Sequence, residues 1–464
     1  MKFELPAFAI EILDKFEAAK FEIYIVGGAV RDLLTKKLVD DWDFTTNATP
    51  EEILKILPDG YYNNIFGTVG ITLESSPNPL EITTFRREYG YSDYRRPDKV
   101  EWGKTLEEDL ERRDFTINAM AIAVVETEEL KKLRTKKQKE VDCKLIDTFA
   151  GRKDLDEKLI RAVGKAESRF KEDALRMMRA IRIAGELGFT IEEKTFNAIK
   201  KNSELINKIA KERVTDELLK ILASPNPYEG IVLFRNSGLM AQILPEMEAT
   251  FGIEQKSPGR HHIYDVGTHS LLSLKYVAEK NQDPIVRFAT LIHDIGKPAT
   301  FKKQKNGVIT FYNHEIISAR IAKDIANRLM FSKKQADKLW RLVRYHQFTV
   351  DERQTDSAIR RFIRNVGIED VPDMLDLRIG DRLGGGARET SWRLEEFKKR
   401  LIEVQKQPFT VHDLKISGHE VMKTLNIKPG PKVGEILEQL YGEVVEKKIP
   451  NEKKSLLSRL KLLD

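Results

Sequence analysis

The pattern of apolar and polar positions changes character near residue 155. Before it, short β-rich runs alternate with helical runs, whereas the rest of the chain follows a helical period almost throughout. Runs bounded by turn-forming residues predict strands at 22–26, 42–46, 69–74 and 80–85. Helices are expected at 6–19, 29–36 and 50–57, the last with a capping Thr49 and a proline in its first turn. The pattern therefore predicts an α+β domain followed by a long helical body.

Clusters of turn-forming residues divide the helical body. SPNP at 224–227, KSPG at 256–259 and GGG at 384–386 interrupt the helical period. We expect a mixed head, a helical neck, a helical body and a helical tail, at 1–155, 156–225, 226–400 and 401–464. The basic run 131–140 between two apolar stretches predicts a solvated hairpin tip.

Composition narrows the class of protein. A chain of 464 residues is too long for one core, and 41% hydrophobic with 33% charged residues excludes disordered and collagen-like chains. Cys143, the single cysteine, cannot form an internal disulfide, and charges interrupt every apolar stretch at the start. We therefore expect a cytoplasmic protein without a membrane span. A net charge of +6, from 79 basic and 73 acidic residues, permits a polyanionic partner without requiring one.

Two acidic residues share one face of an expected strand. Period-two alternation puts Asp41 and Asp43 on one side and Trp42 and Phe44 on the other. Adjacent carboxylates repel each other, and a bridging divalent cation would offset this, as in two-metal displacement. Glu81, on the expected strand 80–85, would add a third oxygen ligand of the kind that Mg²⁺ prefers. Solvated strand residues are the simpler alternative for all three acids.

Two further segments could bind phosphate. At 24–34 an apolar strand runs through Gly27-Gly28 into a helix, which leaves backbone N–H groups available, although many such junctions are only tight turns. Within 107–123, Arg113 and Asp114 precede an expected apolar helix. Asp114 could cap that helix, or the pair could hold a phosphate and a ribose hydroxyl.

The expected helix 169–182 carries acids and arginines at spacings of three and four residues. Such pairs are ordinarily surface ion pairs. An Asp173 acceptor beside an Arg176 donor also complements the amino group and ring nitrogen that cytosine and adenine share, but not uracil or guanine.

GGAVRD, DWD, RRDFTINAMA and EDALRMMRAIR, in this order, resemble the class II tRNA nucleotidyltransferases, which comprise the CCA-adding enzymes and their poly(A) polymerase relatives. The resemblance covers nearly the whole chain. It implies a polymerase-β-like head in which Asp41 and Asp43 bind Mg²⁺ with help from Glu81. It further implies that Asp173 and Arg176, with Glu172 steadying Arg176, read incoming CTP and ATP. The implied nucleotide-binding residues are Gly27, Gly28, Arg31, Arg113, Asp114, Asp173, Arg176, Arg179 and Arg182.

In this family Arg113 with Asp114 would select ribose, and the tRNA 3′ end would be the partner. The stretch 85–102, with Asp93, Arg95 and Arg96, resembles the full-length loop of enzymes that add all of CCA. This favours complete over CC-only addition, while addition of A alone or poly(A) synthesis stays open. The segment 416–437 resembles the family's tRNA-holding tail, and Glu212 with Arg213 could steady the neck. The sequence does not give the oligomeric state.

Of eight histidines, six lie between 261 and 346. A single helical histidine is usually an ordinary core or surface residue, but imidazoles grouped with carboxylates suit Mn, Fe, Ni or Zn. The segment TLIHDIGKPAT resembles the central motif of HD phosphohydrolases, which implies such a domain at about 262–385. The implied metal ligands are His269, His293, Asp294 and Asp381, with His314 and His346 as candidates for a second ion or a substrate phosphate.

An HD domain implies hydrolysis of phosphoesters, including 2′,3′-cyclic phosphates at tRNA ends. A hydrolase whose head only binds RNA is the more distant alternative. His412 and His419 lie outside the histidine group and are expected at the surface.

Overall fold

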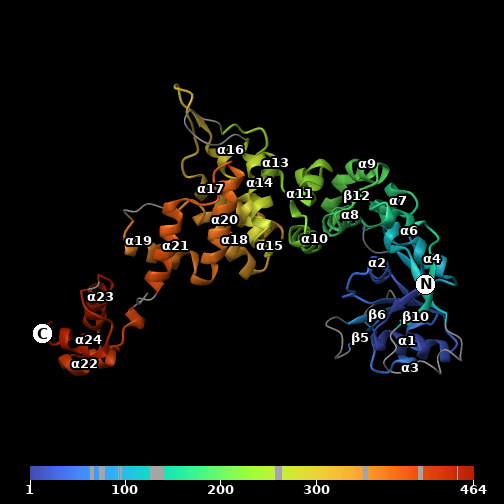
Figure 1. Ribbon diagram of the computed structural model, residues 1–464, viewed down its shortest axis with the longest axis horizontal. Coiled ribbons are helices and arrows are strands. Elements are labelled where there is room, and N and C mark those ends of the chain that lie inside the picture. Colours follow the sequence, from blue (N-terminus) through green and yellow to red (C-terminus); the bar gives the residue numbers. More distant parts are fainter. Residues whose placement is uncertain are drawn as a thin grey trace. The chain divides into compact units, whose positions relative to one another are not determined.

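The computed structural model describes residues 1–62, 67–72, 79–91, 94, 97–125, 140–255, 264–348, 354–405, 411–446 and 448–463. It divides into two compact units. One contains Met1–Phe251 with Asp324–Ser332, and the other contains Gly252–Lys323 with Lys333–Asp464. Figure 1 shows the main sheet in the blue to teal part of the chain and helices in the green to red parts.

A mixed sheet occupies the head. Its strand order is β1-β10-β9-β2-β3-β6-β5-β4, with β3 and β6 parallel and the other pairs antiparallel. The strands are β1 (Lys2–Glu4), β2 (Ile23–Val26), β3 (Asp43–Thr46), β4 (Tyr61–Tyr62), β5 (Thr68–Ile71), β6 (Leu80–Thr84), β9 (Ala121–Val124) and β10 (Glu140–Ile146). The four predicted strands and the α+β fold class are confirmed.

Short helices and a hairpin surround this sheet. They are α1 (Ala7–Ala18), α2 (Gly28–Leu34), α3 (Pro50–Ile56), α4 (Leu106–Glu111), β7 (Arg86–Tyr89) and β8 (Lys99–Trp102). The three predicted head helices are confirmed, and α3 starts with a capping box between Thr49 and Glu52. The basic run 131–139 lies outside the described residues.

The apolar helix expected after Asp114 is wrong. The chain makes a single 3₁₀ turn, η1 (Thr116–Asn118), and enters β9. This strand pairs with β10 on one side and β2 on the other, and its Ala121 and Ile122 are fully buried. A short continuous apolar run fits either a buried strand or a buried helix, so periodicity did not separate them.

Helices form the rest of the first unit. They are α6 (Gly151–Asp156), α7 (Ala166–Glu172), α8 (Arg176–Leu187), α9 (Glu193–Asn202), η2 (Ser203–Lys208), α10 (Lys211–Ala223), α11 (Pro227–Asn236), α12 (Leu239–Ile243) and α13 (Pro245–Glu248). One short parallel pair, β11 (Leu159–Ile160) with β12 (Thr190–Ile191), joins them.

The second unit is helical apart from one small hairpin. Its elements are α14 (Val266–Ala278), α15 (Pro284–Ile292), α16 (Lys297–Thr300), β13 (Lys302–Lys303), β14 (Ile309–Thr310), α17 (His314–Arg328), α18 (Lys333–Tyr345), α19 (Asp356–Val366), η3 (Ile368–Asp370), α20 (Val371–Gly384) and α21 (Trp392–Gln405). The last turn of α17 belongs to the first unit. Helix α20 packs on α14 (Figure 1). A Cβ at Gly380 would overlap Val277, and one at Gly384 would overlap Ser273. The two glycines therefore allow the close approach that brings α14 and α20 side chains together.

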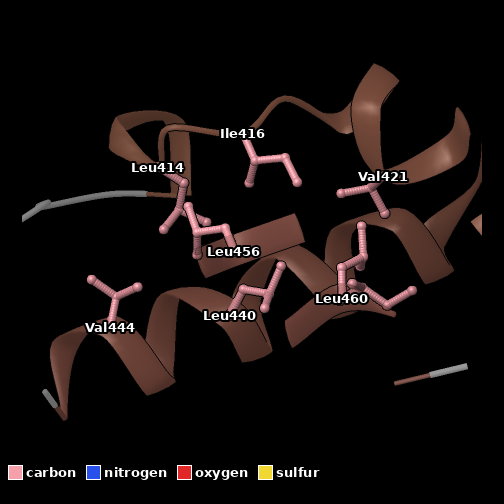
Figure 2. Close-up of a cluster of buried hydrophobic side chains, with 8 residues drawn as sticks. Leu414, Ile416, Val421, Leu440, Val444, Leu456 and Leu460 are labelled. Atoms are coloured by element: carbon pink, nitrogen blue, oxygen red, sulfur yellow. The ribbon is translucent and has the colours of Figure 1, made fainter. Parts of the chain in front are cut away.

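The tail has a hydrophobic core of its own. It comprises η4 (Val411–Asp413), α22 (Gly418–Leu425), α23 (Pro431–Val445) and α24 (Lys453–Leu460). Figure 2 shows the buried side chains that these elements share, which are Leu414, Ile416, Val421, Ile436, Leu440, Val444, Leu456 and Leu460. His412 and His419 are exposed, as predicted. Among the described helices, none has the length and apolarity that crossing a bilayer requires.

Candidate active sites

The head carboxylates meet on neighbouring strands. Asp43 of β3 lies opposite Glu81 of β6 in the parallel register. Asp41, two residues earlier, is exposed, while Trp42 and Phe44 are buried at 6% and 1% exposure. The predicted alternation and the predicted neighbouring strand are therefore both present.

These acids interact electrostatically. Burial, together with the like charges of Asp41 and Glu81, raises the pKa of Asp43 to about 6 against the opposing effect of Arg113. Burial and then Asp41 also raise the pKa of Glu81. A divalent cation would offset this repulsion, and three carboxylates are the donors that Mg²⁺ prefers. The residues present fit the expected ion.

Gly27 brings the turn before α2 against this site. Its φ is +74°, a conformation that favours glycine. A Cβ there would lie 3.1 Å from Asp43 Oδ2 and 3.1 Å from Arg113 Nη1. At Gly28, a Cβ would lie 3.5 Å from Arg31 Nη2. Gly27 thus lets the backbone approach Asp43 and Arg113, whereas a side chain at Gly28 would be in ordinary contact with Arg31.

A hydrogen-bonded chain links Arg31 to the neck. Arg31 donates to both oxygens of Asp32 at 2.9 Å and to Asn118 Oδ1 at 3.1 Å. Asn118 Nδ2 donates to Asp114 Oδ1 at 3.2 Å, and Arg179 Nε donates to Asp114 Oδ2 at 2.8 Å. Asn118, which the sequence reasoning did not single out, connects the two halves of this chain.

The ionised form of the Asp114 carboxyl group is strongly favoured. Burial opposes ionisation, but Arg179 and Arg176 hold the pKa of Asp114 at about 2. Asp114 therefore stays a carboxylate in the neutral pH range.

The ion-pair partner of Arg113 is Asp109. Arg113 Nη2 donates to Asp109 Oδ2 at 3.2 Å, and Arg112 Nε donates to Asp109 Oδ1 at 2.9 Å. Helix α4 places Asp109 one turn before both arginines, whereas Asp114 lies past the helix end and meets α8. Buried Asp109 was missed because its spacing resembles an ordinary helix pair.

The single helix expected at 169–182 is also wrong. Helix α7 ends at Glu172 and α8 begins at Arg176, with Asp173 in an extended conformation at φ −134° and ψ 106°. Asp173 Oδ1 accepts from the Leu175 N–H at 3.0 Å, and its Oδ2 accepts from Arg213 Nη2 at 3.0 Å. A short acidic side chain that bonds nearby backbone competes with the helix ladder, which accounts for the break.

Arg176 is fixed at both ends of its guanidinium. Nη1 donates to Glu172 Oε2 at 2.8 Å, as predicted, and Nη2 donates to the carbonyl of Arg112 at 2.9 Å. The Ala174 N–H donates to the carbonyl of Tyr94, in the β7–β8 connection, at 3.3 Å. Asp93, Arg95 and Arg96 of that connection lie outside the described residues.

These side chains surround one pocket of about 430 Å³. Its lining comprises Arg112, Arg113, Asp114, Asp173, Leu175, Arg176, Arg179, Arg213, Asp216, Glu217 and Lys220. Five predicted residues meet here, but Arg182 is outside the lining and instead pairs with Glu217, Nε to Oε2 at 2.9 Å. The α10 residues were mostly missed, although their spacing of three and four places them on one helix face.

Six residues form a second site, the histidine–aspartate cluster. It consists of His269 on α14, His293 and Asp294 after α15, His314 at the start of α17, His346 after α18 and Asp381 on α20. Of these only Asp381 is partly exposed, and the rest are at most 5% exposed. All six lie in the second unit.

Three histidines present the same nitrogen to the cluster. His293 Nδ1 lies 2.7 Å from the carbonyl oxygen of Thr290. His314 Nδ1 lies 2.8 Å from that of Phe311, and His346 Nδ1 lies 2.7 Å from that of Val343. A carbonyl only accepts, so each Nδ1 carries the proton and each Nε2 is left as the ligand atom.

The Nε2 atoms converge in two pairs. His269 Nε2 lies 3.3 Å from His293 Nε2, and His314 Nε2 lies 3.3 Å from His346 Nε2. Asp294 lies between the pairs, with Oδ2 3.3 Å from His293 Nε2 and Oδ1 3.2 Å from His314 Nε2. Two triplets have ligand atoms within 4.8 Å of one another, His269 with His293 and Asp381, and His293 with Asp294 and His346. Imidazole Nε2 atoms grouped with carboxylates fit divalent transition-metal ions.

Charge is unevenly distributed in the cluster. Burial lowers the pKa of His293, but Asp294 and Asp381 together raise it to about 10. Burial and then His293 and His314 lower the pKa of His346 to about 3. Lys297 Nζ, which the sequence reasoning did not assign, lies 2.5 Å from Asp294 Oδ2.

Comparisons with known proteins agree with the head geometry. The "Poly A polymerase head domain" matches residues 23–161, the "Probable RNA and SrmB-binding site of polymerase A" matches 188–251, and a tRNA nucleotidyltransferase domain 2 matches 316–460. The CCA-adding enzyme of Ligilactobacillus salivarius is 34% identical over 456 residues, which cover 98% of this chain and 96% of that enzyme. The chain belongs to the class II tRNA nucleotidyltransferases.

This tRNA nucleotidyltransferase has further similar relatives. The CCA-adding enzyme of Lactobacillus gasseri is 32% identical over 457 residues, covering 98% of this chain and 96% of that enzyme. The crystal structure of the Bacillus stearothermophilus CCA-adding enzyme in complex with CTP superposes with a TM-score of 0.66 at 26% identity, covering 98% of this chain and 96% of that one. The polymerase-type head and the nucleotidyltransferase activity follow from these similarities.

Proposed function

We propose that this tRNA nucleotidyltransferase adds C, C and A in turn to tRNA 3′ ends, using CTP and ATP and no nucleic-acid template. The observation that carries the proposal is the 430 Å³ pocket, in which Asp173 and Arg176 lie beside Arg113 and Asp114. A carboxylate acceptor next to a guanidinium donor suits the edges of cytosine and adenine. The names of the similar enzymes support the same activity.

Side chains and backbone groups of this chain position the nucleotide for the transfer. Asp41, Asp43 and Glu81 would hold two Mg²⁺ ions, which when bound neutralise charge on the attacking and leaving oxygens. The Gly27 turn offers backbone to the triphosphate, and Arg113 with Asp114 contacts the ribose. Asp173 accepts from the base amino group while Arg176, held by Glu172, donates to the ring nitrogen. The tRNA 3′-hydroxyl then attacks the α-phosphate in line and pyrophosphate leaves.

The test offers a tRNA without its CCA end to the full chain, with each nucleotide separately and in pairs. Addition that requires CTP first and ATP last supports the proposal. Addition of A alone, or a ladder of A residues, supports the A-adding or poly(A) alternatives instead. The variant Asp43→Asn is the negative control, because it removes a carboxylate charge without changing side-chain size.

We further propose that the histidine–aspartate cluster hydrolyses phosphoesters, including 2′,3′-cyclic phosphates at RNA ends. The convergence of Nε2 atoms around Asp294 supports this second activity. The test supplies Mn, Fe, Ni or Zn and compares His293→Ala with His412→Ala, an exposed histidine of the tail. Absence of hydrolysis with every metal would leave the cluster a structural element.

A further inference from the structure

A basic pocket of about 560 Å³ lies beside the histidine–aspartate cluster. Its lining includes Gln347, Phe348, Arg378, Arg382, Trp392 and Arg393, and none of the residues that line it is acidic. The volume is in the range of ordinary ligand pockets, about 300–1,000 Å³. Arg378, Arg382 and Arg393 line it, and arginine guanidinium groups are well suited to binding phosphate oxygens.

Arg378 lines the pocket and also contacts the histidine–aspartate cluster. Arg378 Nη1 donates to Asp381 Oδ2 at 2.9 Å, and the other oxygen of Asp381 lies 3.2 Å from His269 Nε2. Gln347 directly follows His346 in the chain. A ligand bound to Arg378 would therefore lie beside Asp381, which is itself one of the candidate metal ligands.

Trp392, the first residue of α21, lines the pocket and is 63% exposed. The Arg393 guanidinium carbon lies 5.1 Å from its ring centroid. Phe348 stacks on Phe397, with ring centroids 5.3 Å apart. The Arg378 guanidinium carbon lies 5.7 Å from the ring centroid of Phe348. An exposed aromatic ring among arginines, as Trp392 provides, is a means by which proteins hold single-stranded nucleic acid, because every base has a stacking face.

We propose that this pocket binds the last nucleotides of a single-stranded RNA 3′ end, with a base stacked on Trp392 and the phosphates paired with the arginines. Inorganic phosphate alone would need only the arginines, whereas the exposed indole adds a site for a base. The RNA end would thereby present its terminal phosphoester to the histidine–aspartate cluster. That last step rests on the hydrolase proposed above, but the binding itself does not.

The experiment uses the full chain and a short single-stranded RNA that ends in 4-thiouridine 3′-phosphate. Anisotropy measures affinity, and photo-crosslinking with mass spectrometry locates the RNA end. We expect crosslinks at the pocket and a loss of roughly 5- to 100-fold in pocket affinity for Trp392→Ala, largely restored in Trp392→Phe. Arg393→Ala should weaken binding more than Lys399→Ala, which removes an equal charge from an exposed α21 residue outside the pocket lining.

Three results would overturn the proposal. They are unchanged affinity in Trp392→Ala, equally tight binding of an RNA whose last nucleotide lacks its base, and crosslinks confined to the head. Thermal denaturation checks that Trp392→Ala still folds. If the RNA crosslinks at the pocket but is not hydrolysed with any metal, the proposal that the pocket binds RNA is supported. Only the proposal that the cluster hydrolyses phosphoesters is then contradicted.

Discussion

Arg179 and Asp114 form an ion pair across 65 residues of sequence, with Nη2 2.7 Å from Oδ2. Arg179 belongs to α8, and Asp114 follows α4 in the head. Through Asn118 the pair continues to Arg31, in the helix that starts at Gly28. The Arg179–Asp114 pair, continued through Asn118, therefore connects α8 to α2.

Breaking this pair should destabilise the first unit. Asp114 is 8% exposed, so Arg179→Gln leaves a nearly buried carboxylate without its main partner. Because the Arg179 side chain is 36% exposed, we expect a modest loss of about 1–2 kcal/mol in the free energy of unfolding. Urea denaturation in a double-mutant cycle with Asp114→Asn measures the coupling. Arg152→Gln is the matched control, since the Arg152–Asp156 pair is at the surface and should change stability by less than about 0.5 kcal/mol.

The same pair predicts a pH dependence. The folded-state pKa of Asp114 is about 2, below its ordinary value of 3.8, so folding favours the ionised form. This contribution is complete above about pH 4 and is lost as the pH falls from there towards about 2. The difference in unfolding midpoint between the wild type and Asp114→Asn should therefore shrink on acidification. A difference that is constant between pH 6 and pH 3 contradicts the ion-pair account.

Gly27→Ala should reduce nucleotidyl transfer beyond its effect on folding. The positive φ adds a backbone cost of about 1–2 kcal/mol. The new Cβ would also press on Asp43 and Arg113, each only 3.1 Å away. Gly164→Ala is the matched control, because φ there is +66° and nothing lies within 4 Å of an added Cβ. A larger fall in kcat is expected for Gly27→Ala than for Gly164→Ala, and equal activities of the two folded variants would argue against this role for the turn.

Asp173→Ala should relax selection among the four nucleotides more than it slows transfer, because it removes the proposed acceptor for the base amino group. Arg213→Ala should have a weaker effect in the same direction, since Arg213 holds Asp173 Oδ2. Glu212→Ala, an exposed α10 residue outside the pocket lining, should leave selection unchanged. Single-nucleotide incorporation kinetics with each NTP gives the ratios, and an unchanged preference for CTP and ATP in Asp173→Ala refutes the reading role.

Metal removal should destabilise the second unit. Without cations the cluster holds converging Nε2 atoms and buried carboxylates, so bound divalent ions stabilise the folded state. Chelation should lower the melting temperature, and Mn, Fe, Ni or Zn should restore it. Elemental analysis should find less metal in His293→Ala than in His412→Ala. Equal metal content in the two variants, or a melting temperature insensitive to chelation, contradicts the assignment.

Much of the head could be predicted from the sequence, because its strands and helices show clear periodicity and are bounded by turn residues. The alternation around Asp41 and Asp43 also predicted which side chains lie on the same face of the strand. The failures have local physical causes. Asp173 leaves the helix because its carboxylate bonds backbone and Arg213, and Asp109, which was not singled out, is the acid that pairs with Arg113. One-dimensional patterns do not resolve which of several possible partners a charged side chain contacts.

The second unit was predicted less completely. The clustering of histidines and the resemblance to HD phosphohydrolases singled out six residues that the structure brings together. The pairing through Asp294 and the contact with Lys297 depend on how α14, α15, α17 and α20 pack, which periodicity does not specify.

Incubation of a tRNA that ends before its CCA with labelled CTP and ATP, followed by sequencing of the 3′ ends, tests the central claim most directly. The account predicts C, C and A in that order and then a stop, with no product from Asp43→Asn. Ends that carry only A residues, or no incorporation by the wild type, would contradict it.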